Sequence, residues 1–295
     1  MRVNPNPTPD LLTALAQSRQ DEQEALLQLA SGRRVSTPSD DPAAAAVLVG
    51  NRTRTAGVQQ FLRSIASQRT QLQSADSALN SVVLVLQRAI TVGIQGGNGT
   101  LSDSDRNAVA QELLGLQGQV LSLANTSIEG IYLFAGTESQ TAPYVTDTNS
   151  PSGVGYQGNS NVNVLSIGEG FSIPVNVPGA QIFNGAGADV FQALSDLAQA
   201  VRNNMGVDSA VSDVRKALDT VSARRVFYGN TMQQMSTQET FLNSEKLELA
   251  QEENSLAAAD MAASASQLLN AQSARSAALQ AAGNMLRNSL FDYLK

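Results

Sequence analysis

The 295-residue chain has no cysteine, no histidine and no tryptophan, and aromatic residues make up only 4% of it. The absence of cysteine excludes disulfides and thiolate metal sites, but it does not assign a cellular compartment. The absence of histidine excludes a histidine-based catalytic triad, a histidine-bound zinc site and a phosphohistidine relay. With so few aromatic residues, the core must be built from Ala, Leu and Val, which suits closely packed helices in an elongated arrangement.

The charge balance also limits the possible partners. Nineteen basic and 26 acidic side chains give a formal net charge of −7, and the basic residues are spread along the chain. No basic stripe is available to neutralise phosphates, so nucleic acid is not expected as a partner. The first ten residues, MRVNPNPTPD, are rich in proline, and no run approaches the roughly 20 apolar residues of a membrane helix. We therefore expect neither a cleaved signal peptide nor membrane insertion.

Apolar residues recur at helical spacing in several long stretches. A 3-4-7 spacing between residues 9 and 30 predicts a short amphipathic helix. A second helix is predicted to begin at Pro42 and to keep a heptad pattern for about 50 residues. Ser102-x-x-Asp105 resembles a capping box that would begin a third helix. A further long stripe, from Val211 to Leu256, completes a predicted set of paired helices.

Between these helical stretches, the pattern changes from Gly130 onward. Period-two alternation on both sides of Gly168-Glu169-Gly170 predicts a β-hairpin, and Pro174 places its second strand at a sheet edge. Helical periodicity resumes at Val190. The fold is therefore predicted to be mainly α with a small β insert. We expect an elongated antiparallel helical bundle or coiled coil formed by the N- and C-terminal halves.

Both ends of the chain carry a few apolar residues at helical spacing, and these two sets can face each other in a specific antiparallel register. If the ends pair so that residue numbers sum to about 297, Leu29 faces Leu268 and Glu22 faces Arg275. An exposed ion pair of this kind contributes only ~0.2–1 kcal/mol to stability. We therefore expect it to align the two helices and to add little to the stability of their pairing.

The stretch SGRRVSTPSDDP, residues 31–42, is predicted to be a turn between two helices. Gly32 suits a helix end, and Asp41 with Pro42 suits an N-cap followed by the first helical residue. The two arginines are expected to cap the carbonyl end of the preceding helix and to neighbour the two aspartates. This interpretation is favoured over a phosphorylation site at Ser36.

Five separated motifs resemble the flagellar hook-associated protein 3 family, which is related to flagellin. The first follows the pattern LxxxLxSGxRxxxPSDDPxxA and is carried by Leu26, Leu29, Ser31, Gly32, Arg34, Pro38, Ser39, Asp40, Asp41, Pro42 and Ala45. The others are GNGTLS at 97–102 followed by Asp105 and Arg106, LANTSIEGIYLFAGTES at 123–139, the YxGN…IGEG…VNV pattern of the insert, and SLFDYL at 289–294.

The resemblance implies a flagellin-like, non-enzymatic structural subunit of the bacterial flagellum. It implies export by the flagellar type III apparatus without a cleaved signal, helped by an export chaperone, to an extracellular site. There the chain would form a homo-oligomeric ring between hook-associated protein 1 and the flagellin filament. It also implies an inner coiled-coil domain (1–40 and 255–295), a middle domain of long helices (41–130 and 188–254) and an outer insert (131–187).

Three groups of residues are the expected functional positions. The terminal helices would assemble through Leu12, Leu15, Glu22, Leu26, Leu29, Leu268, Arg275, Leu279, Leu286, Leu290 and Tyr293. A hinge or cap motif comprises Gly32, Arg34, Pro38, Ser39, Asp40, Asp41 and Pro42. The family motif at the start of the insert comprises Asn125, Gly130, Tyr132, Leu133, Phe134 and Gly136.

Three alternative functions remain open from the sequence. The first is a flagellin or minor filament subunit, and the second is a secreted helical adhesin or glycan-binding module that acts through residues 140–180. The third, an enzyme, would have to work without histidine, cysteine, a metal cluster or a phosphate-binding loop. No catalytic residue, metal ligand or cofactor is therefore expected.

Overall fold

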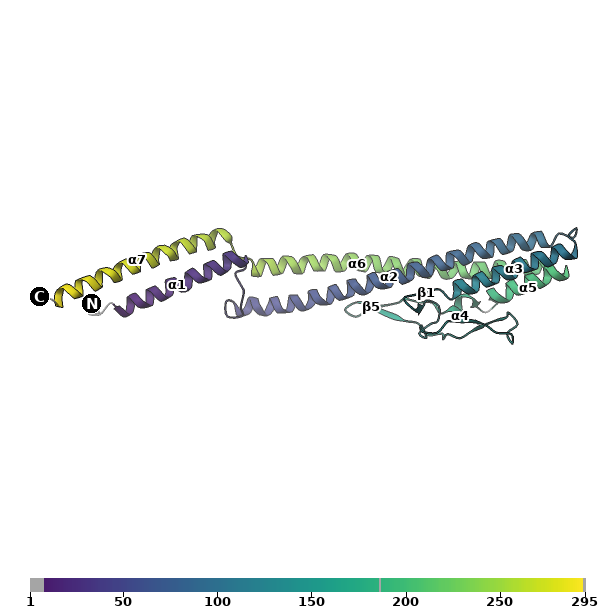
Figure 1. The fold of residues 1–295 in the computed structure, drawn as a ribbon, viewed down its shortest axis with the longest axis horizontal. Helices are drawn as coiled ribbons and strands as arrows, with labels where there is room; N and C mark the ends of the chain where they lie inside the picture. Colours follow the sequence, from purple (N-terminus) through teal and green to yellow (C-terminus); the bar gives the residue numbers. More distant parts are fainter. Residues whose placement is uncertain (1–7, 186, 294–295) are drawn as a thin grey trace. The chain divides into compact units, whose positions relative to one another are not determined.

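A computed structural model describes the backbone of residues 8–185 and 187–293, and the side chains of residues 10–185 and 187–283. Most of the described chain is helical, and short strands lie between α3 and α5 (Figure 1). The helices are α1 (Thr8–Ser31), α2 (Pro42–Gly96), α3 (Asp103–Ala124), α4 (Gly179–Ile182), α5 (Val190–Asn203), α6 (Val207–Ala257) and α7 (Met261–Tyr293). The predicted mainly α fold with a small β insert is confirmed.

The chain divides into two compact units. Unit 1 consists of the two end segments, Met1–Gly57 and Glu245–Lys295, and unit 2 is the central segment Val58–Ser244. The boundaries fall inside α2 and α6 instead of at residues 40 and 255, and the β-rich residues 131–187 group with the long helices of unit 2. The three-part division into inner, middle and outer domains stays a prediction.

In unit 1, helices α1 and α7 lie side by side and run antiparallel (Figure 1). The buried side chains along this pair are small: Ser18, Ala25, Ser264 and Ala271. The Ser264 hydroxyl donates a hydrogen bond of 2.9 Å to the Gln28 side chain across the pair. Because small residues bury little apolar area, this pair gains less from packing than a leucine-rich coiled coil would.

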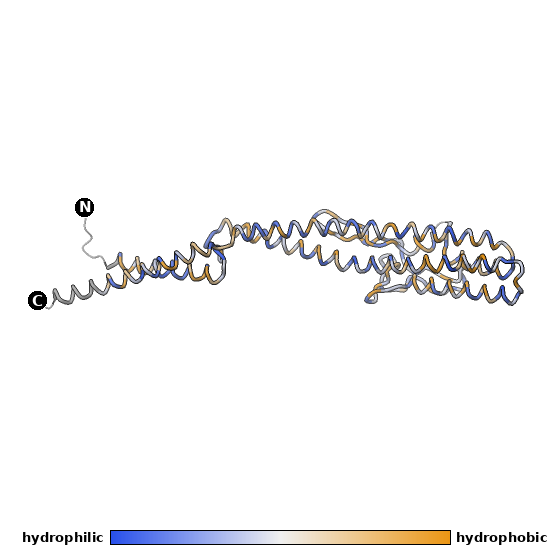
Figure 2. The backbone as a smooth tube through the Cα atoms, turned by 90° about the horizontal axis from the view of Figure 1, so that it is seen from above, coloured by the Kyte–Doolittle hydropathy of each residue, from blue (hydrophilic) through white to orange (hydrophobic). Residues whose placement is uncertain are grey.

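In unit 2, the predicted stripes of the two long helices are largely buried. On α2 the buried residues include Val58, Ile65, Leu72, Ala75, Leu79, Val82 and Leu86, and on α6 they include Val211, Val214, Val221, Tyr228, Met235 and Leu242. Figure 2 shows hydrophobic and hydrophilic residues interleaved along both helices. Ion pairs join the helices at Arg69–Glu239, 2.5 Å apart, and Arg225–Asp76, 2.9 Å apart. These pairs fix an antiparallel register within unit 2.

Helix α3 begins as the sequence predicts. The Ser102 side chain accepts from the Asp105 N–H and the Asp105 side chain accepts from the Ser102 N–H, which completes a capping box. The acidic residues here therefore satisfy the donors of a helix start. In the described residues, no group of three or more acidic side chains could hold a metal ion.

The β insert consists of four separate antiparallel hairpins. Their strands are β1 (Ser127–Ile128) with β2 (Ile131–Tyr132), β3 (Tyr144–Thr146) with β4 (Val154–Tyr156), β5 (Val164–Gly168) with β6 (Phe171–Pro174), and β7 (Asn184–Gly185) with β8 (Ala188–Asp189). Beneath them, Phe134, Tyr144, Tyr156, Phe183 and Phe191 form a cluster with ring centroids 5.0–6.0 Å apart. Five of the 13 aromatic residues of the chain are thus gathered where the strands are too short to build a core alone.

The β5–β6 hairpin forms at the predicted position, with Glu169 and Gly170 as its turn. In its first strand, Val164 is 65% exposed whereas Ile167 is fully buried, so the even-numbered valines do not form the inward face. The pairing of the two strands shifts register between Ser166 and Gly168. Pro174 lies in a two-stranded sheet, where its missing N–H is tolerated as expected.

Helix α2 is long and apolar enough, by length and composition, to cross a membrane. The core helices of proteins outside membranes pass the same test, and Leu79, Val82 and Leu86 on this helix are fully buried in unit 2. The absence of membrane insertion stays a prediction.

Candidate functional site

The two turns of unit 1, between α1 and α2 and between α6 and α7, are joined by backbone hydrogen bonds. Arg33 and Ala258 form an antiparallel bridge. Beside it, the Arg34 N–H donates to the Ala257 carbonyl at 2.7 Å, and the Ala259 N–H donates to the Gly32 carbonyl at 2.9 Å. We call residues 31–44 together with 256–260 the joint. Segments more than 200 positions apart in the sequence are thus paired through their main chains.

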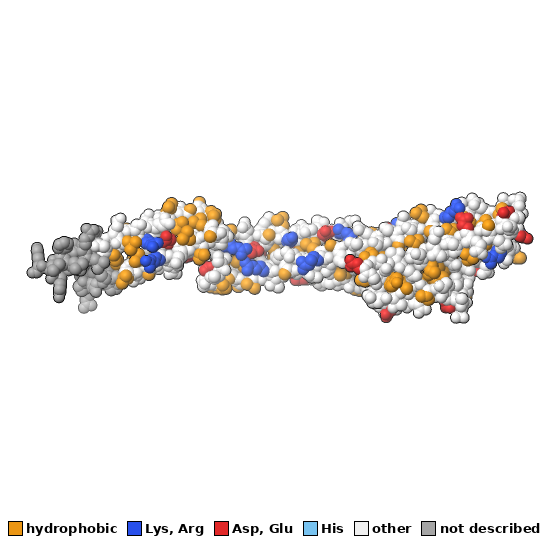
Figure 3. Space-filling model, in the orientation of Figure 1, with side chains coloured by type: hydrophobic (Ala, Val, Ile, Leu, Met, Phe, Trp, Pro, Cys, Tyr) orange, Lys and Arg blue, Asp and Glu red, His pale blue; other side chains and the backbone are white. Residues whose placement is uncertain are grey.

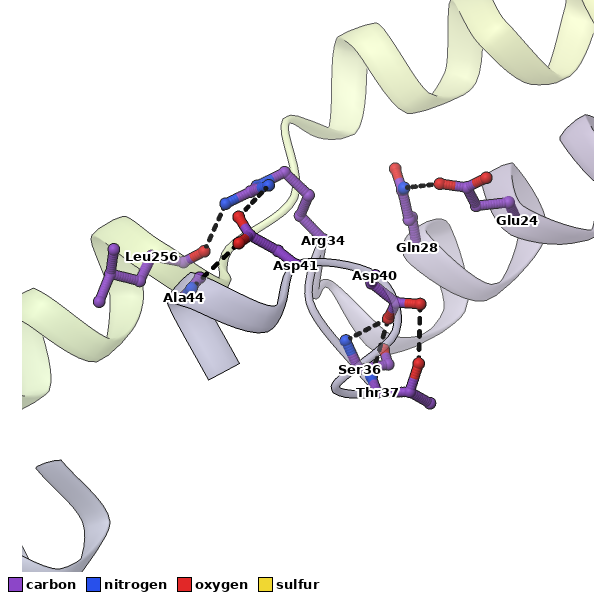
Figure 4. Close-up of polar contacts among 9 residues, drawn as sticks. All are labelled: Glu24, Gln28, Arg34, Ser36, Thr37, Asp40, Asp41, Ala44 and Leu256. Carbon is purple, nitrogen blue, oxygen red and sulfur yellow. Dashed lines mark hydrogen bonds and ion pairs between the residues drawn. The ribbon is translucent and has the colours of Figure 1, made fainter. Parts of the chain in front are cut away.

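Arg34 ties the two sides of the joint together through its side chain (Figure 4). Its Nη2 donates to the Leu256 carbonyl at 3.0 Å, and its Nη1 lies 3.3 Å from Asp41 Oδ2. The prediction that this arginine caps α1 is therefore wrong, because its guanidinium donates to the Leu256 carbonyl near the end of α6, but the expected neighbour Asp41 is confirmed. The end of α1 is instead closed by the Gly32 N–H, which donates to the Gln28 carbonyl at 2.8 Å while Gly32 adopts φ +67°.

The two aspartates of the turn satisfy backbone donors, as predicted for Asp41. Asp41 Oδ1 accepts from the Ala44 N–H at 3.0 Å, so Asp41 caps α2 and Pro42 is its first residue. Asp40 accepts from the Ser36 and Thr37 N–H groups at 2.9 and 2.8 Å, and Thr37 bonds to Ser39 beside Pro38.

These hydrogen bonds also determine the ionisation of the two carboxyls. The Thr37 N–H holds the pKa of Asp40 below its ordinary value, and the Ala44 N–H does the same for the pKa of Asp41. Both carboxylates therefore stay ionised as caps, which does not suit a general acid.

A small apolar cluster lies beneath the joint. Val35 is buried against Ala44 and Leu48 of α2 and against Ala257 of α6. Arg33 adds an ion pair to Glu253 of α6 at 3.3 Å. The turn therefore has defined packing on both helices instead of forming a loose linker.

The predicted assembly residues fall into three groups. Arg275 Nη1 lies 2.8 Å from Glu22 Oε2, as the proposed register requires. Leu15, Leu29 and Leu268 are half-buried, whereas Leu12, Leu26 and Leu279 are exposed. Leu286, Leu290 and Tyr293 lie in α7, but their side chains are outside the described residues.

Two further leucines were missed by the sequence analysis. Leu27 is 66% exposed and Leu269 is 65% exposed, and both lie next to residues assigned to the buried stripe. Figure 3 shows hydrophobic side chains reaching the surface of the α1–α7 hairpin. A count of the apolar residues that lie outside the predicted helix stripe would have identified Leu27 and Leu269.

The motif at the start of the insert holds unit 2 together. Asn125 pairs with the Tyr144 backbone in both directions, at 2.8 and 2.9 Å. Gly130 forms the β1–β2 turn with φ +81°, Tyr132 lies in β2, and Leu133 and Phe134 are buried. The contacts of these residues are structural: they form turns, backbone hydrogen bonds and part of the core.

Gly136 is required by both its conformation and its surroundings. It has φ +71°, and a Cβ atom would lie 2.4 Å from the Asn159 carbonyl oxygen. Its own carbonyl accepts from the Asn163 and Asn176 side chains at 3.3 and 3.2 Å. A side chain at this position would force these contacts apart.

Comparisons with known proteins agree with this architecture. Residues 6–139 match the bacterial flagellin N-terminal helical region. Flagellar hook-associated protein 3 of Salmonella typhimurium is 35% identical over 160 residues, which cover 53% of this chain and 48% of that protein. Flagellin of Listeria innocua is 27% identical over 248 residues, covering 83% of this chain and 81% of that protein.

A solved structure described as a flagellar hook-associated protein of Vibrio parahaemolyticus has a TM-score of 0.69 and 23% identity, and covers 74% of this chain and 100% of that one. The match spans about half or less of the curated hook-associated relatives, 48% and 37% of their lengths. The resemblance predicted from the five motifs is confirmed: the chain has a flagellin-like fold and is similar to flagellar hook-associated protein 3.

Replacing Gly136 by alanine should destabilise unit 2. We expect the free energy of unfolding to fall by about 1–3 kcal/mol, because the positive φ and the close approach of Asn159 both oppose a side chain. Denaturant unfolding measures it. The matched control is Gly118→Ala in α3, where a Cβ meets nothing within 4 Å and a gain of about 0.5–1 kcal/mol is expected. Equal effects of the two changes would contradict the role of Gly136.

Replacing Asp41 by alanine should loosen the joint. The change removes the cap of α2 and the partner of Arg34, so we expect the unfolding midpoint of unit 1 to drop by about 2–4 °C. Asp41→Asn retains a capping oxygen and loses only the charge, so its unfolding midpoint should lie between those of wild type and Asp41→Ala. If calorimetry finds the same unfolding midpoint for Asp41→Ala as for wild type, the turn does not stabilise unit 1 and acts only as a spacer.

Proposed function

We propose that the protein is a structural subunit of the bacterial flagellum that forms the junction between the hook and the flagellin filament. The observation that carries the proposal is the similarity to hook-associated protein 3, in five motifs and at 35% identity, together with a fold that pairs the two ends of the chain. In this role, the protein forms a homo-oligomeric ring that contacts hook-associated protein 1 on one side and flagellin on the other. An export chaperone keeps it competent for export to the cell exterior.

The surface of the α1–α7 hairpin supports an assembly role. Its fully buried residues are small, whereas Leu12, Leu27 and Leu269 are each about two-thirds exposed. These side chains are open to contact with neighbouring molecules. Neighbouring subunits would cover them, and this burial would offset the entropy lost when the hairpin becomes rigid.

The nearest alternative is a flagellin or minor filament subunit. One observation favours this alternative. The alignment with Listeria innocua flagellin covers more of this chain than the alignment with the Salmonella relative does. The two functions differ in how the interface closes, because a junction protein stops at one ring whereas a flagellin adds subunits without end.

Electron microscopy of a deletion strain tests the proposal. We expect intact hooks without filaments and monomeric flagellin in the medium, both restored by the wild-type gene. Filaments of normal length in the deletion strain would contradict a junction role. Purified protein that grows micrometre-long filaments unaided would favour the flagellin alternative.

A charge exchange tests the pairing of the terminal helices. Glu22→Arg and Arg275→Glu should each reduce motility in the complemented deletion strain, because each places two like charges opposite one another. The double variant restores an opposite pair and should recover motility. A double variant as defective as either single one would reject the register.

A further inference from the structure

The chain has two Asn-Gly pairs, Asn98-Gly99 and Asn184-Gly185, and both lie in unit 2. An asparagine that precedes glycine can react with its own main chain, because the glycine nitrogen can attack the side-chain carbonyl carbon and no Cβ atom obstructs the approach. The rate depends on how the fold holds the side chain and the attacking nitrogen. The two pairs are held in different ways.

Asn98 and Gly99 lie in the exposed turn that joins α2 to α3. The Asn98 carbonyl accepts from the Leu101 N–H at 3.2 Å, which closes the turn. In the part of the chain that the structure describes, the Gly99 N–H donates to no protein group, so hydroxide in the solvent can remove its proton. A Cβ atom on Gly99 would meet nothing within 4 Å, so a ring has room to close at this position.

The Asn98 side chain is held above the Gly99 nitrogen by Thr100. Asn98 Oδ1 accepts from the Thr100 N–H at 3.3 Å and from the Thr100 hydroxyl at 3.0 Å. A side-chain oxygen that reaches the N–H two residues ahead brings its carbonyl carbon over the intervening nitrogen. The two Thr100 donors also point at the oxygen on which negative charge develops during attack, as the donors of an oxyanion hole do.

Asn184 has the opposite surroundings. Its Oδ1 accepts from the Tyr144 hydroxyl at 2.8 Å, and its Nδ2 donates to Asp189 Oδ2 at 2.8 Å. The pair lies in β7, where Asn184 is opposite Asp189 and Gly185 is opposite Ala188. The Asp189 carboxylate opposes negative charge beside it, and the side chain must break both hydrogen bonds to move. The same dipeptide is thus locked at one position and free to react at the other.

We propose that Asn98 is a site of spontaneous deamidation, with Gly99 as the attacking residue and Thr100 as the group that promotes the attack. The Gly99 nitrogen, after losing its proton to hydroxide, forms a bond to Asn98 Cγ, and the carbonyl electron pair moves onto Oδ1. The Cγ–Nδ2 bond then breaks, and ammonia leaves with a proton from water, which closes a succinimide ring.

Water opens the succinimide at either of its two carbonyl carbons and gives aspartate or isoaspartate at position 98. The net reaction consumes one water and releases one ammonia. It adds one negative charge to the exposed turn, next to the acidic residues Asp103 and Asp105 that begin α3. The site lies in unit 2 and does not depend on the junction role.

Peptide mapping of the purified full chain at mildly alkaline pH tests the site, with the same chain unfolded in urea as the reference. In the folded chain, Asn98 should convert at least as fast as in urea, in proportion to hydroxide concentration, and with isoaspartate as a product. Asn184 should convert at least about tenfold more slowly than in urea, because its two hydrogen bonds must first open. Slower conversion of Asn98 in the folded chain than in urea would overturn the proposal.

Two variants separate the proposed roles of the neighbouring residues. Thr100→Ala removes the hydroxyl donor and should slow conversion of Asn98 about fivefold through the loss of one hydrogen bond, whereas Thr100→Ser should react like wild type. A turn that were merely loosened by Thr100→Ala would react at the wild-type rate or faster, and that result would contradict the role of Thr100.

Gly99→Ala tests the attacking nitrogen. Gly99 does not have a positive φ and a Cβ atom there meets open space, so the variant should fold like wild type. Its methyl group stands beside the attacking nitrogen and should slow conversion at least about tenfold. Conversion at the wild-type rate in Gly99→Ala would show that water attacks Asn98 directly and would refute the ring-closing step.

Discussion

The backbone bridge between Arg33 and Ala258 is the contact on which unit 1 depends. Closing a loop of more than 200 residues costs conformational entropy, and the bridge, Arg34 and the Val35 cluster together hold that loop closed. Once the two turns are paired, α1 and α7 must leave the joint side by side. The small-residue stripe of the terminal hairpin is then sufficient, because it has only to keep two helices together that already begin next to each other.

Ion pairs determine the register of the antiparallel helices in both units, although they add little to the free energy of unfolding. Glu22–Arg275 and Arg54–Glu245 lie in unit 1, and Arg69–Glu239 and Asp76–Arg225 lie in unit 2. Each pair joins the first half of the chain to the second. Exposed pairs contribute little to stability, but a shifted register would place these charges against apolar or like-charged neighbours.

Much of the fold could be predicted from the sequence because its signals are local. The heptad of α2, the capping box at Ser102, the Asp41 cap and the turn at Gly170 each depend on residues within one or two turns of chain. The α6–α7 turn was missed because its sequence, Ala257-Ala258-Ala259-Asp260, lacks the usual glycine or proline. Its conformation depends on the hydrogen bonds it makes to Gly32 and Arg34, together with Asp260, whose Oδ1 accepts from the Ala262 and Ala263 N–H groups. The target of Arg34 was likewise unpredictable, since it depends on a contact between remote segments.

Amide hydrogen exchange at the joint tests most directly whether the two chain ends are paired within a single subunit. The Arg34 and Ala259 N–H groups donate across the joint to the Ala257 and Gly32 carbonyls. If the account is right, both amides in the purified monomer exchange far more slowly than those of an unstructured chain, and this protection is reduced in Asp41→Ala. Exchange of both amides at the unstructured rate in the wild-type monomer would contradict it.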